Sequence, residues 1–336
     1  MPAITSNQAG RTSARQEQIS QQVEGRFVGE FSAAERILGV VELNRDAAKI
    51  EIGSLGEKDL LRYIDTRRAP LDDYQEVDLT RSTRAHDYGH YGLQATRSVE
   101  AGIFEAMRQV NQFTSVMYQI LVAFLMKQSQ EVLRIAMLID PANWPTSGHA
   151  VDLTGLEWNS GSGDIKGNVE AGLDDIHTAK NLTRNVCTLW LPYQAFQAAI
   201  VDPGFVAAIA ATASPLSLQN QAADAQLSAL QTYLGVDIET DFFGSHEIVG
   251  GDGATQNAWA DNAILYVDHR KTNLVVHPFP GVTTERLGAV YKQGAFAKTQ
   301  TFLERRNNSM KWRRDAAERS WLVQDTMGVL FHGVSV

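Results

Sequence analysis

The sequence has one cysteine, no long apolar run and no excess of basic residues. Because Cys187 is the only cysteine among 336 residues, an intrachain disulfide and a metal site built on several cysteines are excluded. The longest apolar run, Ile120 to Met126, is much shorter than the ~18 residues that suggest a membrane-spanning helix. Residues 1–25 also lack the apolar block of a signal peptide. We therefore expect a protein that is soluble where it is made and has no membrane partner.

The formal net charge of −9 argues against a protein that a broad basic surface holds to nucleic acid. It does not exclude a shell that merely surrounds nucleic acid. Hydrophobic residues make up 44% of the chain and charged residues 21%, as in globular proteins. The length fits one large domain or two ordinary ones.

A long helix is predicted within residues 100–140, which no proline interrupts before Pro141. At ~1.5 Å per residue this helix would be roughly 40 Å long or more, and we interpret it as a spine for the fold. An ordinary long core helix is the alternative. Its expected packed face holds apolar residues at helical spacing: Phe113, Met117, Ile120, Leu121, Phe124, Leu125, Val132, Ile135, Ala136 and Ile139. The polar residues assigned to the opposite face are Gln112, Gln119, Lys127, Gln130 and Arg134.

Two stretches before this helix are too polar to form a core. Residues 1–26 are expected to be a mobile arm unless a partner orders them; a plain disordered tail is the alternative. Residues 60–93 are strongly charged and alternate in places, as a solvated hairpin does. Because such a ribbon is poorly stabilised alone, we expect it to pack on a neighbouring subunit, although an ordinary surface hairpin stays possible. The candidate inter-subunit contacts are Arg62, Arg67, Arg68, Asp72, Asp73, Arg81 and Arg84.

The rest of the chain mixes helices and strands without a βαβ rhythm, which indicates the α+β class. Asp164 is a suitable N-cap for a helix to about residue 180, and Gly235 a suitable end for a helix over residues 219–234. A buried strand is predicted at 186–191, followed by a short helix that Pro192 opens. Short strands follow as far as residue 329, with the polar stretch 307–318 separating the last two.

No stretch of the sequence carries a convincing active site. His86 and His90 would share a face and could bind a metal if they lay on a helix, but Gly89 and its flanks do not indicate helix. Residues 161–167 read GxGxxxG, which is one residue too long for a dinucleotide-binding fingerprint. We assign no catalytic, cofactor-binding or metal-binding residue and predict that the protein is not an enzyme. The alternative kept open is a metal-dependent hydrolase that uses His86 and His90.

The order of these elements resembles the major capsid proteins of tailed bacteriophages, those with the Hong-Kong-ninety-seven type fold. The similarity covers nearly the whole chain: the polar arm, the charged loop with Arg67-Arg68-Ala69-Pro70, the spine helix, and a turn before Trp158. It continues through the segments 164–180, 185–191, 193–203, 259–267 and the strands that end near residue 330. The resemblance implies an arm (1–26), an extended loop (50–93), an axial domain (164–290) and a peripheral domain (27–49, 94–163 and 291–336).

The resemblance also implies that many copies form hexamers and pentamers, which close into an icosahedral phage head around double-stranded DNA. The protein would belong to the virion capsid, assemble in the host cytoplasm and need no cofactor. The short arm implies a separate scaffolding protein; a portal and decoration proteins are further expected partners. Some members join subunits through a Lys–Asn isopeptide bond, for which Lys58 with Asn307 or Asn308 is conceivable, although most members lack it. The other alternative is an encapsulin-type nanocompartment with the same fold, against which the chain length argues.

Overall fold

The computed structural model describes thirteen ranges of the chain. They are residues 33–43, 50–55, 81–86, 89–98, 111–180, 182–210, 222–241, 247–249, 255–259, 261–271, 287–293, 300–304 and 309–335. The predicted arm, residues 1–26, lies outside these ranges, as does the middle of the predicted extended loop.

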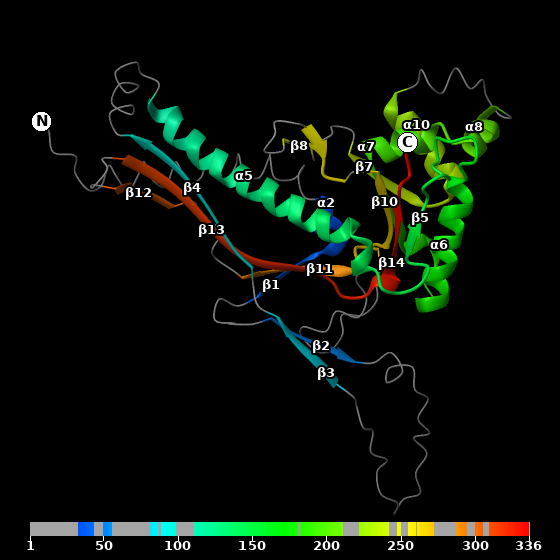
Figure 1. The fold of residues 1–336 in the computed structure, drawn as a ribbon, viewed down its shortest axis with the longest axis horizontal. Helices are drawn as coiled ribbons and strands as arrows, with labels where there is room; N and C mark the ends of the chain where they lie inside the picture. The colour runs from blue at the N-terminus through cyan, green and yellow to red at the C-terminus, as the bar shows by residue number, and fades with distance from the viewer. Residues whose placement is uncertain are drawn as a thin grey trace, which may run out of the picture.

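A long helix lies across a five-stranded sheet (Figure 1). The helix is α5 (Asn111–Ile139), and the predicted residues before it, 100–110, lie outside the described ranges. The strands of this first sheet are β1 (Val40–Leu43), β4 (Gly89–Ser98), β11 (Gly288–Gln293), β12 (Gln300–Glu304) and β13 (Ser309–Leu322). The short helix α2 (Ala33–Leu38) packs against both α5 and β11.

Strand β13 is the centre of the first sheet. It pairs antiparallel with β4 along one side, from Ser309 opposite Ser98 to Glu318 opposite Gly89. Along its other side it pairs first with β12 and then with β11. The prediction that residues 307–318 separate two strands is therefore wrong, because 309–322 form one strand of 14 residues. Each of its residues pairs with a neighbouring strand on at least one side, so its polar composition did not prevent strand formation.

The second sheet has the order β5-β14-β10-β6-β7. Its strands are β5 (Ala150–Asp152), β14 (Gly328–His332), β10 (Asn262–Val267), β6 (Cys187–Pro192) and β7 (Asp237–Asp241). The helices around it are α6 (Ile165–Lys180), α7 (Tyr193–Ile200), α8 (Pro203–Ala210) and α10 (Ala223–Leu234) (Figure 1). Single-turn 3-10 helices occur at Pro141–Asn143, Arg184–Val186 and Asp325–Met327.

Local sequence explains where these helices begin and end. Asp164 accepts a hydrogen bond from the Gly167 backbone N–H at 2.8 Å, as expected of an N-cap. Asp202 does the same for α8 by accepting from the Phe205 N–H at 2.9 Å. Gly235 ends α10 at φ 66°, a left-handed conformation that glycine adopts without steric cost.

Large aromatic side chains fill the core of the second sheet. Trp190 and Trp259 lie with ring centroids 5.5 Å apart, and Trp158 lies 6.0 Å from Phe331. All six residues of β6 and all six of β10 are buried, which fits central strands covered on both faces.

Two hairpins complete the described structure: β2 (Ile50–Leu55) with β3 (Arg81–His86), and β8 (Glu247–Val249) with β9 (Thr255–Asn257). The β2–β3 ribbon projects away from both sheets (Figure 1). None of the helices in the described ranges is both long enough and apolar enough to cross a membrane. The α+β class is confirmed. The division into domains stays a prediction, and strand pairing divides the range 291–336, because β14 lies in the second sheet.

Candidate assembly interface

The face of α5 that packs on the first sheet includes a polar and charged section, contrary to prediction. Gln130, Glu131 and Arg134 are 6%, 1% and 4% exposed, whereas Leu121 and Leu125 are 46% and 41% exposed. The assignment of Gln130 and Arg134 to the solvent face, and of the two leucines to the packed face, is therefore wrong. The cause lies in β13, which presents buried Arg314 and Glu318, so that a section of α5 meets polar partners there.

Arg134 is the centre of a charged cluster, defined here as Glu35, Glu131, Arg134, Lys292 and Glu318. Its Nη2 lies 2.6 Å and 2.8 Å from the two carboxylate oxygens of Glu318, and its Nε donates to the same group at 3.1 Å. Its Nη1 donates to Glu35 at 2.6 Å and to Glu131 at 3.2 Å. The guanidinium fork therefore ties α5 to both α2 and β13 in a fixed geometry.

The two remaining contacts of the cluster hold α2. The Ala34 backbone N–H, in the first turn of α2, donates to Glu131 at 2.6 Å and so gives that helix end a negative partner. Lys292 on β11 donates to Glu35 at 2.6 Å. The cluster thus joins four elements: α2, α5, β11 and β13.

Charge interactions outweigh burial within the cluster. Burial raises the pKa of Glu35, but the positive charges of Arg134 and Lys292 together lower it by a larger amount. The pKa of Glu35 therefore lies below the ordinary 4.5. Burial likewise lowers the pKa of Arg134, and Glu318 and Glu35 more than offset this, so that it is raised. Both groups are therefore charged at neutral pH.

The rest of the α5 interface is aromatic and apolar. Tyr118 stacks on Trp312 of β13 with centroids 4.6 Å apart and an interplanar angle of 11°. On the outer side, Leu133 is 49% exposed, in addition to Leu121 and Leu125.

The structure places two of the seven predicted contact residues. Arg81 and Arg84 lie on β3, where they pair with Leu55 and Ile52 of β2. The other five lie outside the described residues: Arg62, Arg67, Arg68, Asp72 and Asp73. Lys58, Asn307 and Asn308, the residues considered for an isopeptide bond, also lie outside them. The structure therefore locates the base of the predicted loop and leaves its contacts as a prediction.

His86 and His90 do not lie on a helix. His86 is in β3, which pairs with β2, and His90 is in β4, which pairs with β13. Within the described ranges, no three His, Cys, Asp or Glu side chains are grouped as metal ligands.

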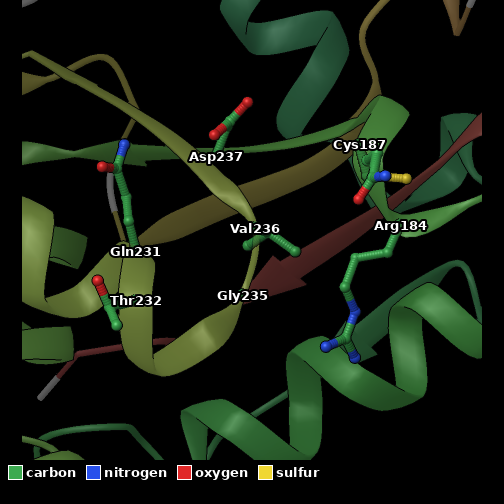
Figure 2. Close-up of a pocket in the computed structure, with 8 residues that line it drawn as sticks. Arg184, Cys187, Gln231, Thr232, Gly235, Val236 and Asp237 are labelled. Carbon is green, nitrogen blue, oxygen red and sulfur yellow. The ribbon is translucent and has the colours of Figure 1, made fainter.

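A polar pocket of about 390 Å³ opens beside the N-terminal ends of β6 and β7. Gln231 and Thr232 of α10 line one side, and Arg184 and Cys187 line the other (Figure 2). Burial raises the pKa of the Cys187 thiol to about 11, so it is not a nucleophile at neutral pH. The lining residues include Asp237 and no histidine.

Sequence reasoning missed the charged cluster. A signal was present: Glu131 and Arg134 are three residues apart on the helix, and opposite charges at this spacing share one face. Glu318 gave no signal of its own, because it lies in a stretch interpreted as a polar connection. Only the pairing of β13 brings Glu318 under α5.

No family model and no curated protein matches the chain. A phage-related protein from Bordetella bronchiseptica RB50 is similar in structure, with a TM-score of 0.60, 16% identity and coverage of 95% of this chain and 97% of that chain. The capsid structure of cyanophage P-SCSP1u gives a TM-score of 0.56 at 8% identity, over 89% of this chain and 86% of that one. A structure from Gordonia phage Cozz gives a TM-score of 0.50 at 10% identity, over 90% of this chain and 86% of that one.

Proposed function

We propose that this chain, which has the fold of phage major capsid proteins, is a shell subunit, many copies of which close into a capsid. The observation that carries the proposal is the extent of the structural similarity. It covers 95% of this chain against a phage-related protein and 89% against a cyanophage capsid structure. The similarity therefore includes both sheets and the long helix rather than one common motif. A structural role without enzymatic activity belongs to this proposal.

The finer assembly follows from the same premise. Copies form hexamers and pentamers of an icosahedral phage head that encloses double-stranded DNA, and the protein resides in the virion after assembly in the host cytoplasm. A separate scaffolding protein, a portal and decoration proteins are the proposed partners. The net charge of −9 supports an inner wall that does not bind packaged DNA tightly.

The β2–β3 ribbon and the loop between its strands contact a neighbouring copy in this proposal. Among the described strands, neither β2 nor β3 has a third partner, and an isolated two-stranded ribbon is marginally stable in water. Arg62, Arg67, Arg68, Asp72, Asp73, Arg81 and Arg84 are the proposed contacts. Each exposed ion pair contributes only ~0–1 kcal/mol, but repetition over a closed shell sets orientation and register.

The charged cluster gives the subunit a fixed shape in this role. A bidentate Arg134–Glu318 pair tolerates less displacement than an apolar contact, because both hydrogen bonds depend on direction. A closed assembly of identical chains reuses the same surface patches of each copy, so the elements that carry those patches must keep their placement within the subunit. We propose that the cluster keeps α5, α2 and the first sheet in one arrangement.

The test is electron microscopy and light scattering of the purified protein, expressed alone and with a candidate scaffolding protein. Closed shells or rings of subunits are the expected result. A monodisperse monomer or dimer in both preparations would overturn the proposal. The matched variants Arg67→Glu with Arg68→Glu, and Arg67→Lys with Arg68→Lys, separate charge from side-chain identity. Only the first pair is expected to impair assembly.

The contents of the particles decide between the two kinds of shell. Nucleic acid inside supports a phage head, and a protein cargo supports a nanocompartment of the encapsulin type. Denaturing electrophoresis of the same particles tests the Lys58 bond to Asn307 or Asn308, and a single band at the subunit mass is expected. Stoichiometric zinc or iron in the pure protein would instead support the hydrolase alternative based on His86 and His90.

A further inference from the structure

Strand β4 forms one edge of the first sheet. Its ten residues pair in unbroken register with β13, from Gly89 opposite Glu318 to Ser98 opposite Ser309. Its other side pairs with no strand among those that the structure describes. Since a strand rises about 3.4 Å per residue, this edge presents roughly 34 Å of backbone N–H and C=O groups.

The edge lacks the features that usually protect such strands. Edge strands are commonly short, bulged, or guarded by lysine, proline or other charged residues. In β4 the sequence GHYGLQATRS has no proline or lysine, and Arg97 is its only residue with a permanent charge. The other edge strands of the two five-stranded sheets differ: β1 has four residues, β5 has three, β12 has five and ends in Glu304, and β7 carries Asp237, Glu239 and Asp241.

The side chains on both faces of β4 also permit close approach. Tyr91, Leu93 and Ala95 alternate as half-buried residues, and the residues between them are exposed. Among these, Gln94 Nε2 donates to Thr96 Oγ1 at 3.3 Å, so the two exposed polar groups are partly satisfied by each other. Side chains 91–96 carry no charge, so an incoming strand meets no electrostatic repulsion from them.

We propose that a strand of a second copy of this chain pairs with the outer edge of β4. The inference rests on the proposed function, in which every subunit is surrounded by identical copies. An uncharged strand is compatible with its own copy, because identical strands with charges of one sign would repel each other. Backbone hydrogen bonds would provide much of the affinity, as in other cases of strand addition.

Hydrogen exchange of the whole protein tests the proposal, with and without assembly. The amides of residues 89–98 that point away from β13 should exchange fast in unassembled subunits and more than about tenfold slower in particles. Slow exchange in both states would show that a segment of the same chain covers the edge. Fast exchange in both states would show that the edge stays bare. Either result overturns the proposal.

Substitution of exposed side chains provides the second test. Gln94→Lys with Thr96→Lys places two positive charges on the edge, whereas Gln94→Thr with Thr96→Gln keeps the side chains uncharged. Both variants should fold, as circular dichroism and the unfolding temperature would verify. The lysine variant should yield less than about a tenth of the particles that the exchanged variant yields, as expected when lysine blocks an edge. Equal yields would overturn the proposal.

The outcomes separate this inference from the function on which it rests. Particles whose β4 amides exchange as in free subunits would leave the shell function intact and reject the strand pairing. If the unaltered protein forms no particles with or without a scaffold, the shell function fails, and the inference fails with it.

Discussion

The two sheets of this protein are stabilised by different interactions. In the second sheet, β6 and β10 are wholly buried, and the core around them contains the large aromatic side chains of Trp190, Trp259 and Phe331. In the first sheet, a section of the α5 interface consists of buried charges around Arg134 and Glu318. Apolar burial contributes stability in proportion to area and has no direction, whereas paired charges depend on distance and angle. The comparison teaches that the second sheet supplies stability and that the first fixes the relative placement of elements.

The charged cluster illustrates why stability and placement differ. Buried ion pairs often contribute little net stability, because desolvation offsets their attraction. Losing one partner is costly, since it leaves a buried charge unpaired. The cluster therefore disfavours displaced arrangements of α5 more strongly than it favours the native one.

The largest expected effect comes from removing an aromatic residue of the second sheet. Trp190→Ala should lower the free energy of unfolding by about 3–5 kcal/mol, because Trp190 is fully buried against Trp259. Urea denaturation of the unassembled subunit measures this. The control is Leu156→Ala, whose side chain is 54% exposed and which should change stability by less than about 0.5 kcal/mol. A loss below about 1 kcal/mol for Trp190→Ala would contradict the account of the second sheet.

The next effect distinguishes ionic from apolar packing. Glu318→Gln should cost about 2–4 kcal/mol, because the buried Arg134 loses its bidentate partner and keeps only Glu35 and Glu131. The double variant Arg134→Met with Glu318→Leu should be closer to the unaltered protein than Arg134→Met alone is. The single change leaves the buried carboxylates of Glu131 and Glu318 both without the guanidinium, whereas the double variant leaves only that of Glu131. The same denaturation measurement compares the variants. If the double variant costs at least as much as the two single changes added together, the interpretation of this interface is wrong.

Acid should act on the cluster through Glu35. Because the pKa of Glu35 is below 4.5 in the folded protein, its contribution is present above that pH and is lost as pH falls through the folded-state value. The Glu35→Gln variant should therefore lose less stability on acidification than the unaltered protein, as urea midpoints across this range would show. Near the second sheet the sign reverses, because burial raises the pKa of Asp202 and protonation then favours the fold. An unchanged pH dependence in Glu35→Gln would refute the role of this carboxylate.

The smallest effect is expected at a surface pair. Arg184 and Glu170 are 3.9 Å apart with side chains 46% and 47% exposed. Arg184→Ala should change the free energy of unfolding by less than about 1 kcal/mol, because solvent screens such pairs. A larger loss, with Arg184→Lys close to the unaltered protein, would show that the positive charge beside the pocket matters more than its exposure indicates.

The elements whose signals are local were predictable from the sequence. Asp164 and Gly235 marked helix ends, and the apolar run around Trp190 marked a buried strand, because each depends on neighbouring residues. The orientation of α5 was not predictable in this way. Its buried face depends on what β13 presents, and apolar periodicity cannot indicate that the partner surface is charged.

The candidate interface was less predictable than the fold. The charged loop indicated a surface that needs a partner, but five of its seven contact residues lie outside the described structure. The open edge of β4 had no sequence signal, since GHYGLQATRS could equally belong to an internal strand. Only the pairing of β4 with β13 shows that one side is left without a described neighbour.

The pairing of β14 has a consequence for the timing of folding during synthesis. This strand lies between β5 and β10 in the second sheet, although nearly 180 residues separate β5 from β14 in the chain. The ribosome produces β5, β6, β7 and β10 before β14, which is the strand that connects β5 to the rest of the sheet. The second sheet therefore cannot be completed early in translation, and contacts of such long range form slowly. Subunits should become competent to associate only late in synthesis, which limits premature association of nascent chains on one messenger RNA.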